Sequence, residues 1–402
     1  MARRLHPDGM PLEHQGPLAR LRRGHEELIL RLLRTHGPLS RADLGKLSGL
    51  SRTTLYDIVG ALVDGGAVVA AVPEATERRR GRPVERLSLH PDAGQAIGID
   101  FARRAVHVAA VNVAHEVIGS AGEAHDADLP WPRRIKLAER LVGGLAGGTL
   151  RLGALSGVGV GVVGPVDAPR LDAEGASGAV DPDLPVLLRK RFGVPVLVDN
   201  NTRLAALAEA TWGAATGVQD VVYLRLSHGV GGGLVVGGAL HRGSHGLSGE
   251  FGHITAEPDG RRCSCGKDGC LETVASIGAV LRAHGGAKDL AGFLAALPHD
   301  PAAARVLDEV GTRVGTVLAA VCNALGPEVT VLGGELTAAG PALFDAVERS
   351  LFAHLMPISR SRAALRPATL GEAAGALGGI ALVLHESPLL ARYPEPTSLE
   401  HT

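Results

Sequence analysis

The chain has 402 residues, 45% of them hydrophobic, so it is long enough for two or three domains with buried cores. It contains no run of about 20 apolar residues and its first residues lack an apolar signal core, which excludes a membrane span and predicts a cytoplasmic protein. The net charge is −1, yet residues 1–90 carry 15 Lys and Arg against 10 Asp and Glu. A basic first segment on an acidic body favours a nucleic-acid-binding module, although a solvated surface has the same composition.

Residues 25–90 have the pattern of a winged helix-turn-helix domain, preceded by an extension, residues 1–24, that we expect to be disordered. The first predicted helix carries its apolar residues on one face: Leu28, Ile29, Leu32 and Leu33. Ser40 is positioned to cap a second helix, with Asp43 completing a capping box, and Ser51 to cap a third. Two short predicted strands follow, joined by an arginine-rich loop, and they complete the wing.

Two groups of residues in this domain are predicted to contact double-stranded DNA. The start of the third helix presents polar and aromatic side chains outward: Ser51, Arg52, Thr53, Thr54 and Tyr56. The wing loop carries four arginines: Arg78, Arg79, Arg80 and Arg82. We expect the helix to enter the major groove and the wing to approach a minor groove. A three-helix protein-interaction domain with a charged loop is the alternative.

Beyond residue 91 the sequence changes to apolar strands separated by glycine turns. One strand–turn–strand pattern begins near residue 96 and a second near residue 221. Two such units about 120 residues apart predict two related α/β lobes with a ligand cleft between them. The strand that ends in "VDNN" (198–201) places a carboxylate and two amides where α/β proteins put their ligand-binding residues.

Three of the four cysteines, Cys263, Cys265 and Cys270, lie within eight residues, and His253 precedes the first of them by ten. Three thiolates and one imidazole form a closed tetrahedral set for Zn²⁺, with no open position for water. This spacing predicts one structural zinc ion per chain. The alternative is a disulfide, which a cytosolic location disfavours.

The body resembles the ROK family of sugar kinases and sugar-responsive repressors. The most specific match is "GEFGHITAEPDGRRCSCGKDGCLE", residues 249–272, which contains the proposed zinc loop. The resemblance implies a two-lobe, actin-like (ribonuclease H-like) domain over residues 91–402. The added winged helix resembles the repressor branch of the family. The resemblance also implies three sugar-binding residues, Glu250, His253 and Glu272. At the strand end, Asn200 and Asn201 are expected to add hydrogen bonds to the sugar hydroxyls. For Glu250 and Glu272 a surface salt bridge is the alternative.

The resemblance also indicates what the chain lacks as a kinase. Family kinases have Asp-x-Gly-x-Thr in the first phosphate turn, whereas here Ala102 and Arg104 replace the glycine and the threonine. Counting back from Glu209 places Asn201 where those kinases have the aspartate that takes a proton from the sugar hydroxyl. An amide cannot accept that proton, and Asp199 is displaced along the strand.

We therefore expect a DNA-binding transcriptional regulator of carbohydrate genes, favoured as a repressor, that responds to a sugar and has no kinase activity. Operator geometry predicts a homodimer or a homotetramer. Two alternatives remain open from the sequence. One is an active ROK sugar kinase with an accessory DNA-binding domain, and the other is a regulator that has lost ligand binding.

Overall fold

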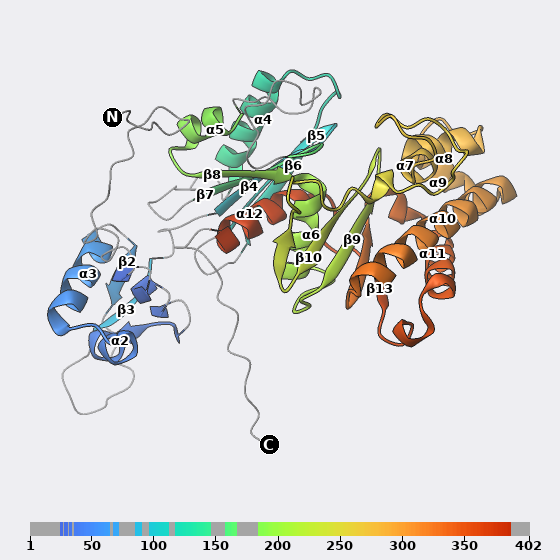
Figure 1. Ribbon diagram of the computed structural model, residues 1–402. Coiled ribbons are helices and arrows are strands. Elements are labelled where there is room, and N and C mark those ends of the chain that lie inside the picture. Colours follow the sequence, from blue (N-terminus) through green and yellow to red (C-terminus); the bar gives the residue numbers. More distant parts are fainter. Residues whose placement is uncertain are drawn as a thin grey trace, which may run out of the picture.

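The computed structural model describes residues 25–26, 28–30, 32–33, 36–64, 67–71, 85–90, 96–111, 117–145, 157–166 and 184–386. These residues form one three-stranded sheet and two five-stranded sheets. Figure 1 shows a small N-terminal module (blue) beside two larger lobes that follow one another across the molecule. No helix among the described residues is long and apolar enough to cross a membrane.

The N-terminal module is built from three helical segments and a small sheet of order β1-β3-β2. The first segment is described only in part, at residues 25–26, 28–30, 32–33 and 36. The remaining elements are β1 (Leu39–Ser40), α2 (Arg41–Ser48), α3 (Arg52–Asp64), β2 (Val68–Ala71) and β3 (Arg86–Leu89). The first segment buries Leu30 as well as the predicted Ile29 and Leu33.

Helix caps form where the sequence predicts them. The Ser40 hydroxyl accepts from the backbone N–H of Asp43, and the Asp43 carboxylate accepts from the Ser40 backbone, which completes a capping box. The hydroxyl of Ser51 accepts from the backbone N–H of Thr54 at 3.2 Å at the start of α3. The arginine wing falls in residues 72–84, so Arg78, Arg79, Arg80 and Arg82 lie outside the described residues.

The N-terminal lobe contains a five-stranded sheet of order β6-β5-β4-β7-β8. Its elements are β4 (Ala96–Phe101), β5 (Ala105–Val111), β6 (Val117–Ala124), α4 (Trp131–Gly144), β7 (Gly157–Val162), α5 (Leu184–Phe192), β8 (Val196–Asn200) and α6 (Asn201–Trp212). The pairs β4–β5 and β5–β6 are antiparallel, whereas β7 is parallel to both β4 and β8. The predicted strand–turn–strand pattern near residue 96 therefore corresponds to β4, β5 and β6.

The C-terminal lobe repeats this arrangement in a sheet of order β11-β10-β9-β12-β13. Its strands are β9 (Val221–Leu226), β10 (Val230–Val236), β11 (Ala239–His241), β12 (Val329–Gly333) and β13 (Ala364–Pro367). Its helices are η2 (Phe251–His253), α7 (Glu272–Ala275), α8 (Ile277–His284), α9 (Leu290–Ala296), α10 (Pro301–Leu325), η3 (Glu335–Ala339), α11 (Pro341–His354), η4 (Pro357–Ser359), η5 (Gly371–Ala373) and α12 (Ala374–Glu386). Figure 1 shows α10 and α11 (orange) side by side at the far end of the molecule.

Helix α12 returns from the end of the described chain to cover the sheet of the N-terminal lobe. Glycines on both surfaces allow this close approach, because a Cβ added at Gly159 would lie 1.9 Å from the carbonyl oxygen of Gly379. At Gly378 of α12, an added Cβ would lie 1.9 Å from the carbonyl oxygen of Leu204 in α6. The helix thus packs backbone to backbone against both β7 and α6, and it joins the two lobes.

A buried carboxylate ties α6 to the segment that leads into α12. Glu209 is fully buried and accepts hydrogen bonds from the backbone N–H groups of Thr369 and Leu370, both at 2.9 Å. It also accepts from the backbone N–H of Ala214 at 2.7 Å. These bonds satisfy the ionised side chain and fix the end of α6 against the start of α12.

Candidate functional site

The strand β8 ends at three polar residues that are all buried but serve different purposes. Asn200 is the N-cap of α6, and its side-chain oxygen accepts from the backbone N–H groups of Thr202 and Arg203. Its amide nitrogen donates to the carbonyl oxygen of Gly164 at 2.9 Å. The cap explains why a helix begins directly after the strand, and it already uses most of the hydrogen-bonding capacity of Asn200.

Asn201 faces the first strand of the same sheet. Its amide nitrogen donates to Oδ1 of Asp100 at 3.1 Å, and both side chains are buried. Burial raises the pKa of Asp100, while nearby Arg225 and the bond from Asn201 act in the opposite direction. An amide at position 201 therefore stabilises the Asp100 carboxylate, whereas a carboxylate there would repel it.

The carboxylate of Asp199 accepts hydrogen bonds from two arginines. Its Oδ1 accepts from Nε of Arg203 at 2.7 Å, and its Oδ2 accepts from Nε of Arg242. Asp199 and Arg203 are each 1% exposed. The side chain of Arg203 also donates to the carbonyl oxygens of Val166 and Gly246. Both carboxylate oxygens of Asp199 thus accept from arginines, and Asp199 is not among the residues that line the cleft described below.

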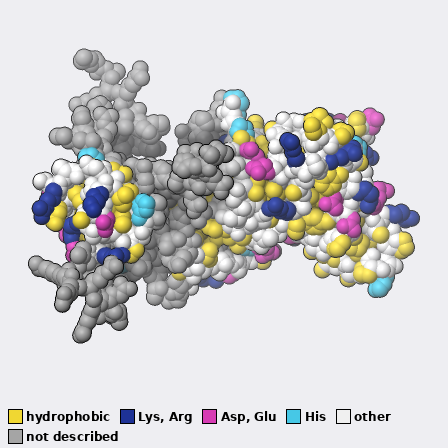
Figure 2. Space-filling model, turned by 90° about the horizontal axis from the view of Figure 1, so that it is seen from below, with side chains coloured by type: hydrophobic (Ala, Val, Ile, Leu, Met, Phe, Trp, Pro, Cys, Tyr) yellow, Lys and Arg dark blue, Asp and Glu magenta, His cyan; other side chains and the backbone are white. Residues whose placement is uncertain are grey.

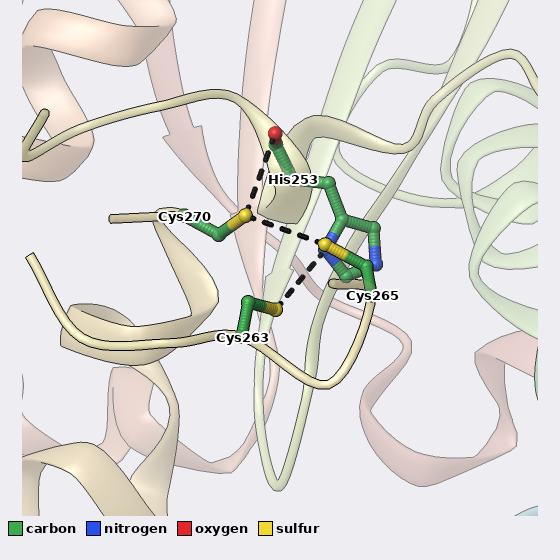
Figure 3. A group of neighbouring side chains, drawn as sticks. All are labelled: His253, Cys263, Cys265 and Cys270. Atoms are coloured by element: carbon green, nitrogen blue, oxygen red, sulfur yellow. Dashed lines mark hydrogen bonds between the residues drawn. The ribbon is translucent and has the colours of Figure 1, made fainter. Parts of the chain in front are cut away.

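The four predicted metal ligands lie together in the C-terminal lobe, as Figure 3 shows. Their ligand atoms all lie within 4.8 Å of one another. The Sγ of Cys263 is 3.6 Å from Nδ1 of His253, and the Sγ atoms of Cys265 and Cys270 are 3.6 Å apart. A tetrahedron with metal–sulfur bonds of about 2.3 Å has edges of about 3.8 Å. The donor set therefore fits a tetrahedral metal ion, and all four cysteines are free thiols.

The local fold brings these ligands together through short turns. Gly266 and Gly269 have positive φ angles of 93° and 68°, which lets the chain reverse direction between the cysteines. A Cβ added at Gly269 would lie 1.5 Å from the carbonyl oxygen of Glu257, so the loop closes on itself tightly. The ammonium group of Lys267 donates to the carbonyl oxygen of His253 at 2.9 Å.

The thiols differ in how readily they ionise. Burial raises the pKa of the Cys270 thiol to about 12, and hydrogen bonds with the other two cysteines act in the same direction. The backbone N–H of Lys267 lowers the pKa of Cys265. Because metals bind the thiolate form, a cation entering this site must displace the proton of Cys270.

A cleft of about 940 Å³ lies next to the cysteine loop. One wall, which we call the loop wall, is formed by Leu247, Glu250, His253, Cys265 and Glu272. The Nε2 atom of His253 lies 4.0 Å from Oε2 of Glu250, on the opposite side of the ring from Cys263. Glu272 accepts from the backbone N–H of Val230 at 3.0 Å, which fixes its carboxylate.

Asn200, Asn201, Glu250, His253 and Glu272 all line this one cleft. The structure thus brings together the five residues that the sequence suggests for a sugar. Burial raises the pKa of Glu250, while His253 and Arg203 act in the opposite direction. Carboxylates, an imidazole and amides converging on one cavity provide acceptors and donors suited to a ligand rich in hydroxyl groups.

The opposite wall, which we call the hairpin wall, consists of residues 102–105, 107 and 120–124. Arg103 and Arg104 form the exposed turn between β4 and β5, directly after Ala102. Between the walls, Arg225 of β9 is 19% exposed and lies 3.7 Å from Glu335. Charged side chains therefore line this part of the cleft, whereas a phosphate cradle is built from backbone N–H groups free of bulky side chains.

Comparison with known proteins identifies the lobes. Residues 140–386 match the model of the ROK family. The chain belongs to the ROK family.

This ROK protein is similar to proteins of two kinds, a kinase and transcriptional regulators. A glucokinase of Halalkalibacterium halodurans is 38% identical over 214 residues, which is 48% of this chain and 64% of that protein. The DNA-binding transcriptional repressor Mlc of Escherichia coli K12 is 27% identical over 411 residues, covering 95% of this chain and 99% of that protein. A crystal structure of a ROK family transcriptional regulator, a homologue of the E. coli MLC protein, is 27% identical with a TM-score of 0.71, covering 92% of this chain and 98% of that one.

The N-terminal module of this ROK protein exposes the helix start that the sequence predicts as a DNA contact. Ser51, Arg52, Thr53 and Tyr56 are exposed, and Thr54 is half-buried. The guanidinium groups of Arg41 and Arg52 lie 5.2 Å and 5.7 Å from the ring centre of Tyr56. Figure 2 shows basic side chains (dark blue) on this module, together with a few acidic ones (magenta).

Sequence reasoning missed three buried or half-buried arginines: Arg203, Arg225 and Arg242. Each arginine lies in a segment whose pattern points to a different residue or to a strand. A signal for Arg203 was present, because an arginine four residues after Asp199 can bond back to it across one helical turn. Arg225 and Arg242 gave no such signal, since their partners Glu335, Asp199 and Glu386 are far away in the sequence.

Proposed function

We propose that this ROK protein is a sugar-responsive, DNA-binding transcriptional regulator of carbohydrate genes, a repressor, without kinase activity. The observation that supports the proposal is the presence, in one chain, of a small N-terminal module with the helices α2 and α3 and of a cleft lined by polar residues of both lobes. The similarity to the repressor Mlc extends over both parts, whereas the similarity to the glucokinase covers 48% of the chain.

The proposed ligand contacts are those of the cleft. Glu250 and Glu272 accept hydrogen bonds from sugar hydroxyls, Asn201 and Asn200 add amide contacts, and His253 contacts the sugar through Nε2. The cysteine loop holds one structural Zn²⁺ through Nδ1 of His253 and the thiolates of Cys263, Cys265 and Cys270. When bound, the ion fixes the segment that presents Glu250, His253 and Glu272 to the cleft.

The absence of kinase activity follows from two sites in the cleft. Asn201 has no proton affinity at neutral pH, and Asp199 is occupied by Arg203 and Arg242. In addition, Ala102 and Arg104 stand in the turn that carries a glycine and a threonine in the family's kinases. A sugar bound here is therefore a signal that the protein detects and does not consume.

The proposed DNA contacts are the exposed start of α3, with Ser51, Arg52, Thr53, Thr54 and Tyr56, and the wing arginines. A two-fold assembly, dimer or tetramer, places two such modules on a palindromic operator. Closure of the lobes on a sugar changes the spacing or orientation of the modules, and with it the affinity for DNA.

Genome-wide mapping of binding sites, with and without glucose, xylose and N-acetylglucosamine in the medium, tests this function. We expect discrete palindromic sites near carbohydrate genes and a change in their occupancy with one of the sugars. The Arg52→Ala variant should lose preference for these sites over random DNA. Binding without sequence preference in the wild-type protein, or ATP consumption with a hexose at ordinary kinase rates, would refute the proposal.

A further inference from the structure

Four charged side chains connect the strand end behind the cleft to the last turn of α12. We call them the Asp199 network: Asp199, Arg203, Arg242 and Glu386. Asp199 accepts from both arginines, and Nη1 of Arg242 lies 2.5 Å from Oε1 of Glu386. Arg242 is 29% exposed and Glu386 is 39% exposed, so the network runs from the interior to the surface.

The network crosses from one lobe to the other. Asp199 belongs to β8 of the N-terminal lobe, and Arg242 follows β11 of the C-terminal lobe. Arg203 extends the connection, since its guanidinium donates to the carbonyl oxygen of Val166 after β7 and to that of Gly246 after β11. A rotation of the lobes therefore changes the distance between Arg242 and Asp199, and charge–charge interactions with little water around them depend steeply on such distances.

The network also lies next to the cleft. Asp199 is adjacent to Asn200, whose backbone N–H donates to Oδ1 of Asp199 at 2.7 Å. On the other side, Gly246 immediately precedes Leu247, which lines the loop wall. Movement of either segment on a ligand therefore reaches the Asp199 network directly.

At its far end the network reaches α12, a helix that shares an apolar cluster with the N-terminal module. One continuous cluster of buried apolar side chains contains Leu33 and Leu87 of that module together with Val383 and Leu384 of α12. Figure 1 shows the module (blue) on the side of the molecule where α12 (red) lies, away from α10 and α11. Glu386 is two residues beyond Leu384, so the ion pair with Arg242 holds the end of α12 that packs near the module.

We infer that the ion pairs of Arg242 with Asp199 and Glu386 transmit the state of the cleft to the DNA-binding module. Lobe movement shifts Arg242, Arg242 displaces the last turn of α12, and the apolar cluster reorients the N-terminal module. This inference rests on the proposed function and adds the route by which a ligand changes DNA affinity. The ion pairs of Arg242 are a physical connection between the cleft and the DNA-binding module. Ligand binding at either site can change the equilibrium between their two arrangements.

The variant Arg242→Gln tests this route without unfolding the strand end. Asp199 keeps its bonds to Arg203 and to the Asn200 backbone when Arg242 is neutralised, so its charge stays paired. Glu386→Gln breaks the network at its other end. Asp308→Asn is the matched control, because it removes an ion pair with Arg349 whose two side chains are about 60% exposed, in the C-terminal lobe.

The first measurement uses calorimetry with glucose, xylose and N-acetylglucosamine, together with the DNA affinity of a mapped operator fragment with and without each sugar. We expect the wild-type protein and Asp308→Asn to change DNA affinity by about 5- to 150-fold on sugar binding. Arg242→Gln and Glu386→Gln should bind the sugar with unchanged Kd but change DNA affinity by less than about threefold. If they bind the sugar and respond as the wild type does, the route is wrong and the proposed function stands.

The second measurement needs neither sugar nor DNA and so keeps the inference testable if no sugar binds. Hydrogen exchange of the full chain compares Arg242→Gln with the wild type and with Asp308→Asn. In Arg242→Gln we expect faster exchange in the last turn of α12 and in α2 and α3 of the N-terminal module. Asp308→Asn should exchange as the wild type does. Exchange that is faster in α12 but unchanged in the module would overturn the inference.

Discussion

Each lobe has three antiparallel strands, then two parallel strands, then a helix that follows the last strand. The lobes differ in what lies between the third and fourth strands. In the N-terminal lobe the described part of that connection contains α4, whereas in the C-terminal lobe it contains the cysteine loop and α7 to α10. The connection that is not repeated supplies Glu250, His253 and Glu272 to the cleft, whereas Asn200 and Asn201 come from the repeated part, where β8 meets α6.

The equivalent helices α6 and α12 show a second difference. Helix α6 starts at the cleft, with Asn201 facing Asp100, and ends at Trp212, one turn after the buried Glu209. Helix α12 starts near the cleft but ends at Glu386, beside the Asp199 network. Helix α6 thus presents Asn201 to the cleft, whereas α12 carries Glu386 of the Asp199 network, although each helix follows the last strand of its lobe.

The largest expected effect concerns the cysteine loop, which lies in the connection between β11 and β12 of the C-terminal lobe. Cys265→Ser should remove stoichiometric zinc and abolish the response to sugar, because three ligands no longer close the tetrahedron. Cys322→Ser is the control, since Cys322 is buried in α10 away from the metal ligands. Elemental analysis after dialysis measures the metal, and full zinc content in Cys265→Ser would refute the ligand set.

The next effect concerns the packing of α12 on the sheet of the N-terminal lobe, at its contact with β7. Gly159→Ala should lower stability by about 3 kcal/mol, because its Cβ would overlap the carbonyl oxygen of Gly379 and neither backbone can move freely. Gly143→Ala, at an exposed position of α4 with open space around it, should instead gain about 0.5–1 kcal/mol. Thermal unfolding of both variants gives the comparison, and equal midpoints would show that the close approach is not required.

Asn201→Asp tests the ligand-facing end of α6. It should lower stability by about 2 kcal/mol at pH 7, because two buried carboxylates then lie side by side. The folded-state pKa of the pair is raised above the unfolded value of about 4, so the loss is largest above the raised pKa and shrinks as pH falls. Asn201→Ser adds no second carboxylate and should therefore show a weaker pH dependence, from Asp100 alone.

The same Asn201→Asp variant bears on catalysis. ATP consumption with glucose should stay at background, because Ala102 and Arg104 still occupy the turn of the hairpin wall. A coupled ADP assay measures it. Turnover in this single variant would mean that the hairpin wall does accept a nucleotide phosphate.

The smallest effect is expected in the N-terminal module, which neither lobe repeats. Ser40→Ala removes the side-chain acceptor of the capping box on α2 and should cost about 1 kcal/mol. Thr53→Ala, on the exposed face of α3, is the control for stability. Hydrogen exchange in α2 reports the difference, and equal protection in the two variants would contradict the role of the cap.

Local signals in the sequence were sufficient for the elements that depend on neighbours in the chain. The caps at Ser40 and Ser51, the strands that flank the glycine turns and the grouping of Cys263, Cys265 and Cys270 with His253 all follow from spacing over a few residues. The family resemblance added Glu250 and Glu272, and the structure brings both to one cleft.

The remaining features depend on contacts between distant segments. The position of α12 on the first sheet rests on glycines at 98, 159 and 379, and a glycine gives no sign of its partner in a sequence. The Asp199 network joins residues more than 100 positions apart, as with Arg242 and Glu386. The sequence predicts Asn200 as a sugar contact, but its role as the cap of α6 depends on where the strand ends.

The place of α12 has a consequence for the order in which the chain acquires its structure during synthesis. The sheet that begins at Ala96 is covered by residues 374–386, which leave the ribosome last among the described residues. Until then, the apolar face around Gly98 and Gly159 has no partner helix and is exposed to other chains. The N-terminal lobe is therefore made first and completed last, and a nascent chain that stalls before residue 374 carries an open apolar sheet.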